Sequence, residues 1–361
     1  MVDNKDICEA PMKTQQYKLI CLLLVLSMMM GIMLGCAGKE PSTSQNPSIP
    51  STTIAPSTAT PTESEATAPT DPPTEPTIPP TEPPAPTEPT PEPPSVNAKY
   101  SFIYDTRTGS FLYSSADIYT SLYPASVTKL FTAYVALQFL DPDESVTVGK
   151  ELSLVAEDAS TAGLEKGQTW TVEGLLYCAL LPSGCDASYT LAVAAGRKIL
   201  LNPDASVQDA LKAFMVQCNF LAWELGMENT NFITPDGYHR KNHYISMMAY
   251  PIIAQCILED EVLSAIVKCS STTVTYKNAA GRKCSTKMWN TNKLVNSAAT
   301  EFYRSEAVGL KTGSTTPAGY CLLSAFQVEG GYIVIGVFGC SVKEHRFTET
   351  NKLFDYYLEL Q

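Results

Sequence analysis

Residues 124–130 (PASVTKL) place Ser126 three positions before Lys129, and two further short motifs follow along the chain. Residues 183–185 (SGC) form the second motif, and residues 311–313 (KTG) form the third. A serine and a lysine at this spacing occur by chance in many chains of ordinary composition. The three motifs in this order, however, supply a nucleophile, a base and an anion-holding strand. These are the parts of a serine acyl-transfer site.

Ser126 and Lys129 are expected on one face of a helix, because helical residues three positions apart are neighbours. The spacing of the apolar residues predicts that this helix runs from Ser126 to Leu140. A serine hydroxyl becomes a good nucleophile when a base takes its proton, and Lys129 can do so only as a neutral amine. Burial or a second nearby cation favours the neutral form, and Lys311 is the candidate cation. Without the other motifs, Ser126 would be interpreted as a helix N-cap and Lys129 as a solvated lysine.

Together these motifs resemble those of the serine-type D-alanyl-D-alanine carboxypeptidases, the low-molecular-weight penicillin-binding proteins. The resemblance extends from about Lys99 to Gln361 and rests on residues 124–130, 181–187 (LPSGCDA), 309–314 (GLKTGS), 171–176, 225–232, 234–237 and 243–246. It implies an α+β fold of the penicillin-binding protein and β-lactamase type, in which an antiparallel sheet carries an inserted helical lobe. It implies no cofactor.

The resemblance also assigns catalytic roles. Ser126 would attack the substrate carbonyl and Lys129 would act as the base. Ser183 would relay a proton between Lys129 and the leaving amine, although a turn serine after Pro182 is the simpler interpretation from sequence alone. The backbone N–H groups of Ser126 and Ser314 would stabilise the oxyanion.

Substrate binding is assigned to Cys185, Lys311, Thr312, Gly313 and Ser314. Lys311 and Thr312 would hold the substrate carboxylate, and Gly313 leaves room for a ligand along the strand. Cys185 departs from the family, which usually has Asn there to bond the substrate backbone and help place the lysine. Because a thiol is a weak donor and acceptor, we expect an active but slower enzyme. A thiol nucleophile and a disulfide with Cys178 remain alternatives.

The pattern of apolar residues predicts the main secondary structure. Residues 100–104 and 111–113 flank a glycine-containing turn, and residues 320–327 and 332–339 flank another, so each pair predicts a hairpin. Helices are predicted at 170–200, 205–226 and 346–360. Strands at both ends with helices between them predict a sheet assembled from distant segments.

The first 98 residues differ in composition from the rest. Residues 1–35 contain a basic flank and an apolar run, which indicate a secretory signal. Cys36 follows Leu34-Gly35 in a sequence that resembles a bacterial lipobox, so we expect its lipidation, with an uncleaved membrane anchor as the alternative. Residues 36–98 form a linker rich in Pro, Thr and Glu, which cannot bury a core. The predicted catalytic domain is 99–361.

These features predict an exported protein that is tethered to the outer face of the bacterial membrane and reaches into the cell wall. Residues 41–98 contribute much of the net charge of −12, and no Lys/Arg cluster of the kind that nucleic acid needs is present. His239 and His243 are four residues apart without an intervening Glu, so a metal site is not expected. The domain's eight cysteines contain no CxxC pair, which disfavours a zinc ribbon.

The predicted activity is removal of the terminal D-alanine from peptidoglycan stem peptides through an acyl-enzyme, with β-lactam antibiotics as covalent inhibitors. A class A-like β-lactamase is one alternative, and it would need a glutamate such as Glu157, Glu165 or Glu173 for deacylation. A catalytically impaired wall-binding protein on the same fold is the other alternative, and Cys185 is the residue that favours it.

Overall fold

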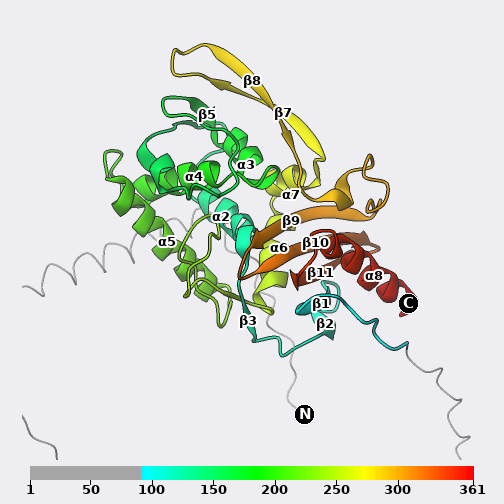
Figure 1. The fold of residues 1–361 in the computed structure, drawn as a ribbon. Coiled ribbons are helices and arrows are strands. Elements are labelled where there is room, and N and C mark those ends of the chain that lie inside the picture. Colours follow the sequence, from blue (N-terminus) through cyan, green and yellow to red (C-terminus); the bar gives the residue numbers. More distant parts are fainter. Residues whose placement is uncertain (1–90) are drawn as a thin grey trace, which may run out of the picture. The chain divides into compact units, whose positions relative to one another are not determined.

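The computed structural model describes residues 91–361, so the predicted leader, Cys36 and most of the linker lie outside the described residues. Its largest sheet has five antiparallel strands in the order β2-β1-β11-β10-β9 (Figure 1). The strands are β1 (Tyr100–Asp105), β2 (Ser110–Ser114), β9 (Ala307–Thr315), β10 (Gly319–Val328) and β11 (Gly331–Cys340). Both predicted hairpins and the assembly of the sheet from distant segments are confirmed.

Both faces of this sheet are buried, which explains why β10 and β11 are almost continuously apolar. In β1, Phe102 belongs to the core shared with the helical lobe, whereas its neighbour Ile103 belongs to the core under the C-terminal helix. The same alternation separates Leu323 from Leu322 in β10. Successive side chains of a strand point to opposite faces. The closing helix α8 (His345–Glu359) therefore covers one face and the helical lobe covers the other.

The helical lobe lies between β1–β2 and β9–β11 in the sequence. Its helices are α2 (Thr128–Leu137), α3 (Val172–Leu180), α4 (Cys185–Ile199), α5 (Val207–Glu224), α6 (Ala249–Glu259) and α7 (Glu261–Lys268). Helix α2 is buried on almost every side and packs against α3, α4, α5 and α6. This central position carries Lys129 into the interior. Among residues 91–361 no helix has the length and apolar character needed to cross a membrane.

Two predicted helices have different limits in the structure. The helix expected from Ser126 to Leu140 starts with a 3₁₀ turn, η1 (Ala125–Val127), and its α-helical part ends at Leu137. The range 170–200 begins in a strand, β5 (Thr169–Thr171), and is then divided between α3 and α4. The division falls at Ser183, whose φ of 68° is incompatible with a right-handed helix. A turn therefore places the second motif between two helices.

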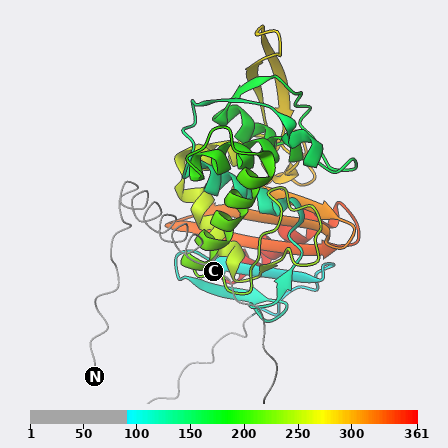
Figure 2. The ribbon, with the colours of Figure 1, turned by 90° about the vertical axis from the view of Figure 1, so that its left-hand side faces the viewer.

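A second sheet was not predicted from the sequence. It has the order β4-β5-β7-β8, with β4 (Ser145–Thr147), β7 (Ser271–Lys277) and β8 (Lys283–Trp289). The β7–β8 hairpin projects beyond the helical lobe in both ribbon views (Figure 2). Near its turn the hairpin is held by Tyr276, whose ring stacks on Trp170 of β5 with centroids 4.2 Å apart. The short elements β3 (Ser121–Leu122), β6 (Ile245–Ser246), η2 (Lys150–Leu154) and η3 (Lys293–Val295) complete the fold.

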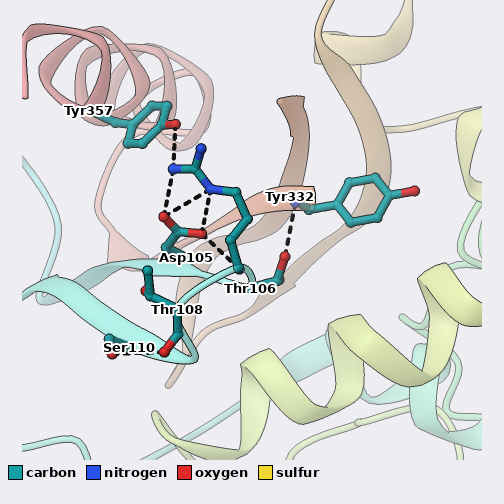
Figure 3. Close-up of polar contacts among 7 residues, drawn as sticks. Asp105, Thr106, Thr108, Ser110, Tyr332 and Tyr357 are labelled. Atoms are coloured by element: carbon teal, nitrogen blue, oxygen red, sulfur yellow. Dashed lines mark hydrogen bonds and ion pairs between the residues drawn. The ribbon is translucent and has the colours of Figure 1, made fainter. Parts of the chain in front are cut away.

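Polar contacts tie the first hairpin to the closing helix (Figure 3). Arg107 Nη2 donates to Asp105 Oδ2 at 2.7 Å and to the Tyr357 hydroxyl at 3.0 Å. The backbone N–H of Tyr332 in β11 donates to Thr106 Oγ1 at 2.9 Å. The turn between β1 and β2 is thereby attached to both α8 and β11.

Contacts with the domain begin before Lys99, the first residue of the predicted catalytic domain. The carbonyl of Pro91 accepts a hydrogen bond from the Tyr356 hydroxyl, and that of Ser95 accepts one from Lys352. The end of the predicted linker therefore contacts α8.

Candidate active site

Lys129 lies at the centre of the site, fully buried, and its amine contacts three groups from three parts of the chain. Its Nζ is 2.8 Å from Ser126 Oγ, 2.9 Å from the carbonyl oxygen of Asp236 and 3.3 Å from Cys185 Sγ. An ammonium has three N–H donors, and all three have a partner here. A neutral amine fits the same geometry, because it donates two bonds and can accept one from the Ser126 hydroxyl. The hydrogen-bond geometry of the site therefore accommodates Lys129 both as an ammonium and as a neutral amine.

Two glycine backbones enclose the turn that carries Ser126. A Cβ on Gly237 would collide with the carbonyl of Ala125, and a Cβ on Gly313 would lie 3.1 Å from the backbone nitrogen of Ser126. Ala125 itself has a φ of 48°, in the left-handed region that non-glycine residues seldom adopt. Such backbone geometry persists where the surrounding structure imposes it. The close approach of the two glycines thus fixes the position of Ser126.

The three motifs meet at one cleft of about 820 Å³. Of the residues predicted from the sequence, Ser126, Ser183, Cys185, Thr312, Gly313 and Ser314 line it. Lys129 and Lys311 are buried beneath its wall. Strand β9 is an edge strand of the large sheet, as expected for the KTG motif. The structure therefore brings together all eight predicted catalytic and substrate-binding residues.

Lys311 is buried without a carboxylate partner among the described residues. Its Nζ donates to the Thr312 carbonyl at 3.1 Å and lies 3.5 Å from Thr291 Oγ1. Burial, followed by the charge of Lys129, holds the pKa of Lys311 well below its usual range. The charge of Lys129 therefore acts on Lys311, whereas the role of Lys311 as the second cation that favours a neutral Lys129 stays a prediction.

Ser183 lines the cleft and is almost completely buried. Its carbonyl accepts a 2.7 Å hydrogen bond from Ser160 Oγ, which holds the turn. Within residues 91–361 its hydroxyl is not hydrogen-bonded to Ser126 or Lys129, whose amine contacts Ser126, Cys185 and Asp236 instead. The relay role of Ser183 stays a prediction.

Cys185 is buried at the start of α4, where the family usually has Asn. Burial raises the pKa of its thiol; the charge of Lys129 opposes this rise and that of Asp236 adds to it. The thiol is therefore protonated at neutral pH, which disfavours a thiolate nucleophile. All eight cysteines of the described region are free, so the structure contains no Cys178–Cys185 disulfide.

Three contributors to the site were not assigned a role from the sequence. The Asp236 carbonyl holds Lys129, but a backbone acceptor leaves no side-chain signal; only its place in the matched range 234–237 pointed to it. Arg346 lines the cleft, 95% of it is buried, and its Nη1 donates to the Gly313 carbonyl at 3.3 Å. From the sequence alone, Arg346 is predicted only as the first residue of the closing helix. Thr291 Oγ1 lies 2.6 Å from Thr312 Oγ1 and joins the base of the β7–β8 hairpin to the KTG strand.

Other chemistries find little support in the described region. No group of His, Cys, Asp and Glu side chains in residues 91–361 is arranged to hold a metal ion. Glu157, Glu165 and Glu173 are exposed and do not line the cleft. His239 lines the cleft rim, whereas His243 is buried and bonded to Thr128.

A serine, a buried lysine and a cation-bearing strand edge around one cleft define a serine acyl-transfer enzyme. Residues 87–341 match the family described as D-alanyl-D-alanine carboxypeptidase. The chain is 33% identical over 269 residues to a D-alanyl-D-alanine carboxypeptidase of Streptomyces sp. strain K15, an alignment that covers 73% of this chain and 88% of the relative. It is 28% identical to D-alanyl-D-alanine carboxypeptidase DacF of Bacillus subtilis, where the alignment covers 72% of this chain but 61% of the relative.

Solved structures agree with these matches. The Streptomyces K15 DD-transpeptidase superposes with a TM-score of 0.66 at 30% identity, covering 74% of this chain and 99% of that one. Penicillin-binding protein D2 of Listeria monocytogenes has the same fold, with a TM-score of 0.58 at 23% identity over 73% of this chain and 98% of that one. The chain belongs to the D-alanyl-D-alanine carboxypeptidase family, which confirms the predicted family and the predicted α+β fold.

His243 makes stability depend on pH. Its Nδ1 accepts from the backbone N–H of Thr234 at 3.2 Å, so its Nε2–H donates to Thr128 Oγ1 at 3.0 Å. Burial lowers its pKa to about 4; Asp236 opposes this shift, while His239 and Arg240 reinforce it. Below about pH 6.5 the unfolded chain therefore binds a proton that the folded chain does not, and stability falls as pH falls.

We expect this histidine to remove about 2 kcal/mol from the free energy of unfolding between pH 7 and pH 5. Urea unfolding at both pH values, for the unaltered protein and for His243→Gln, measures the contribution. The difference between the two pH values should shrink by that amount in the variant. An unchanged difference would show that His243 is protonated equally in both states.

Substitutions of Cys185 test how much its thiol contributes to turnover. Cys185→Ala should lower kcat/KM about two- to twelvefold, because it removes one acceptor for the Lys129 amine. Cys185→Asn should restore or exceed the unaltered rate, since an amide oxygen is a stronger acceptor. Carboxypeptidase kinetics under reducing conditions provide the measurement. Near-complete loss in a correctly folded Cys185→Ala variant would reveal an essential thiol.

Proposed function

We propose that the protein is an exported serine carboxypeptidase that removes the terminal D-alanine from peptidoglycan stem peptides through an acyl-enzyme. The observation that carries this proposal is the 2.8 Å contact between Lys129 Nζ and Ser126 Oγ in the cleft wall. A base within hydrogen-bond reach of a serine hydroxyl is the geometric requirement for nucleophilic catalysis.

In the first step, Ser126 Oγ bonds to the carbonyl carbon between the two D-alanines while Lys129 takes the hydroxyl proton. The backbone N–H groups of Ser126 and Ser314 are the proposed donors to the resulting oxyanion. The C–N bond then breaks, and the leaving D-alanine amine receives a proton through Ser183. In the second step, water adds to the ester carbonyl, and the C–Oγ bond breaks to regenerate Ser126.

Recognition of the terminal carboxylate is proposed for the wall formed by β9 and the start of α8. Thr312 and Ser314 supply hydroxyls there, and Lys311 lies buried behind them. Arg346 adds a cation that forms no ion pair with an acidic side chain of the described region, and its Nε has no hydrogen-bond partner there. A buried unpaired charge is costly, so a substrate carboxylate would stabilise this wall.

β-Lactams are proposed as covalent inhibitors that acylate Ser126. The Listeria relative was solved in a cefotaxime-bound form. The cleft of this protein is lined by Asp158 and Asp236 but by no glutamate, so it lacks the residue that would make deacylation fast in a class A-like β-lactamase. An acyl-enzyme formed with penicillin should therefore persist.

Acylation by penicillin tests the nucleophile and the base together. The unaltered protein should gain the mass of one penicillin molecule, and the adduct should last for minutes or longer. Ser126→Ala should gain none, and Lys129→Ala should lose several orders of magnitude in acylation rate, because the two groups act as a unit. Intact-mass analysis gives the readout, with exposed Ser110→Ala as the matched control.

An adduct of equal yield on Ser126→Ala would disprove the assignment of the nucleophile. Turnover of a diacyl-lysyl-D-alanyl-D-alanine peptide distinguishes the remaining alternatives. A β-lactamase would hydrolyse penicillin quickly, and a wall-binding protein would turn over neither compound.

The proposed location is the outer face of the bacterial membrane, with the catalytic domain carried into the wall on the linker. Support comes from the apolar leader, the lipobox-like residues 34–38 (LGCAG) and the proline-rich composition of residues 41–98. Stable anchoring takes two lipid chains, because one chain holds only marginally.

Cys36 should carry the lipid. In a bacterial host fed a labelled fatty acid, the unaltered protein should incorporate label and lose its leader. Cys36→Ser should incorporate none and should leave the membrane fraction or keep the leader uncleaved. An unlabelled protein that retains residues 1–35 would instead support the transmembrane anchor.

A further inference from the structure

The β7–β8 hairpin is a basic surface with no acidic residue of its own. Between residues 271 and 289 it carries Lys277, Arg282, Lys283 and Lys287, all exposed. None of these cations belongs to an ion pair of the described region. The charges are therefore uncompensated in a protein whose net charge is negative.

Strand pairing gathers three of these lysines on one face. Lys277 is directly opposite Lys283, and Lys287 is opposite Thr273. Because side chains alternate along each strand, this outer face consists of Thr273, Thr275, Lys277, Lys283, Ser285, Lys287 and Trp289. The inner face carries Val274, Tyr276 and Met288 and packs toward the body. Like charges placed opposite each other destabilise a hairpin, and an anionic partner would relieve that repulsion.

The outer face continues into the catalytic cleft. Trp289 is 57% exposed, and Lys287 Nζ lies 4.0 Å from the centroid of its ring. The next two residues, Asn290 and Thr291, line the cleft. Asn290 Nδ2 donates to the Cys269 carbonyl at 2.9 Å, which anchors the base of the hairpin. A ligand that leaves the cleft along Thr291 would therefore meet the aromatic ring and then the lysines.

We propose that this outer face binds the carboxylate-bearing glycan–peptide polymer to which the scissile stem peptide is attached. The proposal rests on the proposed function, and it adds a second contact region outside the cleft. Lysine ammonium groups match the carboxylates of neighbouring stems, the hydroxyl side chains match sugar hydroxyls, and Trp289 offers an apolar ring to a saccharide. A seven-residue strand extends about 23 Å, so the surface spans several residues of a polymer beyond the reacting peptide bond.

The consequence is a preference for polymer over short peptide. The test compares soluble, un-cross-linked glycan strands that bear pentapeptides with a diacyl-lysyl-D-alanyl-D-alanine peptide. The ratio of kcat/KM on the strands to kcat/KM on the peptide should fall about tenfold in a Lys277→Gln, Lys283→Gln, Lys287→Gln variant, because three exposed ionic contacts are lost together. Added salt should lower the ratio for the unaltered protein but have little effect on the variant's ratio.

A control variant carries the same three substitutions at exposed lysines elsewhere, Lys150, Lys212 and Lys241, and should keep the unaltered ratio. An unchanged ratio in the hairpin variant would overturn the proposal. An equal loss on both substrates would also overturn it, because that result would indicate a structural role.

A binding measurement separates this surface from the catalytic assignment. Ser126→Ala protein should co-sediment with purified peptidoglycan, and adding the three hairpin substitutions should weaken that binding about tenfold. If the unaltered protein turned over neither substrate but the hairpin variant still lost binding, the proposed function would fail and the surface would stand. Binding unaffected by the substitutions would reject the surface, whatever the catalytic result.

Discussion

The site depends on burying one amine where three distant segments meet. Lys129 reaches the interior because α2 is surrounded by other helices, and its Nζ can have partners there only if the chain supplies them. A hydroxyl from the same helix start, a thiol from the start of α4 and a carbonyl from Asp236 meet this need. Since a buried polar group without partners is costly, folding and the assembly of the catalytic centre are linked.

The large sheet supplies the fixed side of the cleft. Strand β9 is held by β10 along its length, and its free edge faces the nucleophile. Gly313 allows that edge to approach Ser126 closely, and Gly237 allows its own backbone to approach the carbonyl of Ala125. The positions of Ser126 and of the strand that carries residues 311–313 are therefore set by backbone packing rather than by flexible side chains. Such pre-organisation is what stabilisation of an oxyanion requires.

Basic side chains lie both at the cleft and farther out, on the β7–β8 hairpin. Lys311 and Arg346 are buried basic side chains at the cleft that meet no acidic side chain within residues 91–361. The lysines of the β7–β8 hairpin extend the positive surface outward. Both features suit a substrate that ends in a carboxylate and belongs to a larger anionic polymer. Cys185 keeps its proton through burial and so acts as a weak partner of Lys129 rather than as a competing nucleophile.

The sequence by itself determined the family, the motif residues, both hairpins of the large sheet and the closing helix. These features are local: Ser126 and Lys129 share one helix start, and strand and helix periodicities are visible within a dozen residues. The tertiary structure alone decided the division of residues 170–200 at Ser183, the second sheet, the entry of Arg346 into the cleft and the role of the Asp236 carbonyl. Each of these depends on contacts between segments far apart in sequence. A backbone carbonyl is common to every residue, and a lysine-rich hairpin becomes a surface only when its strands pair. The physical reason is that contacts over long sequence separations leave no local pattern to interpret.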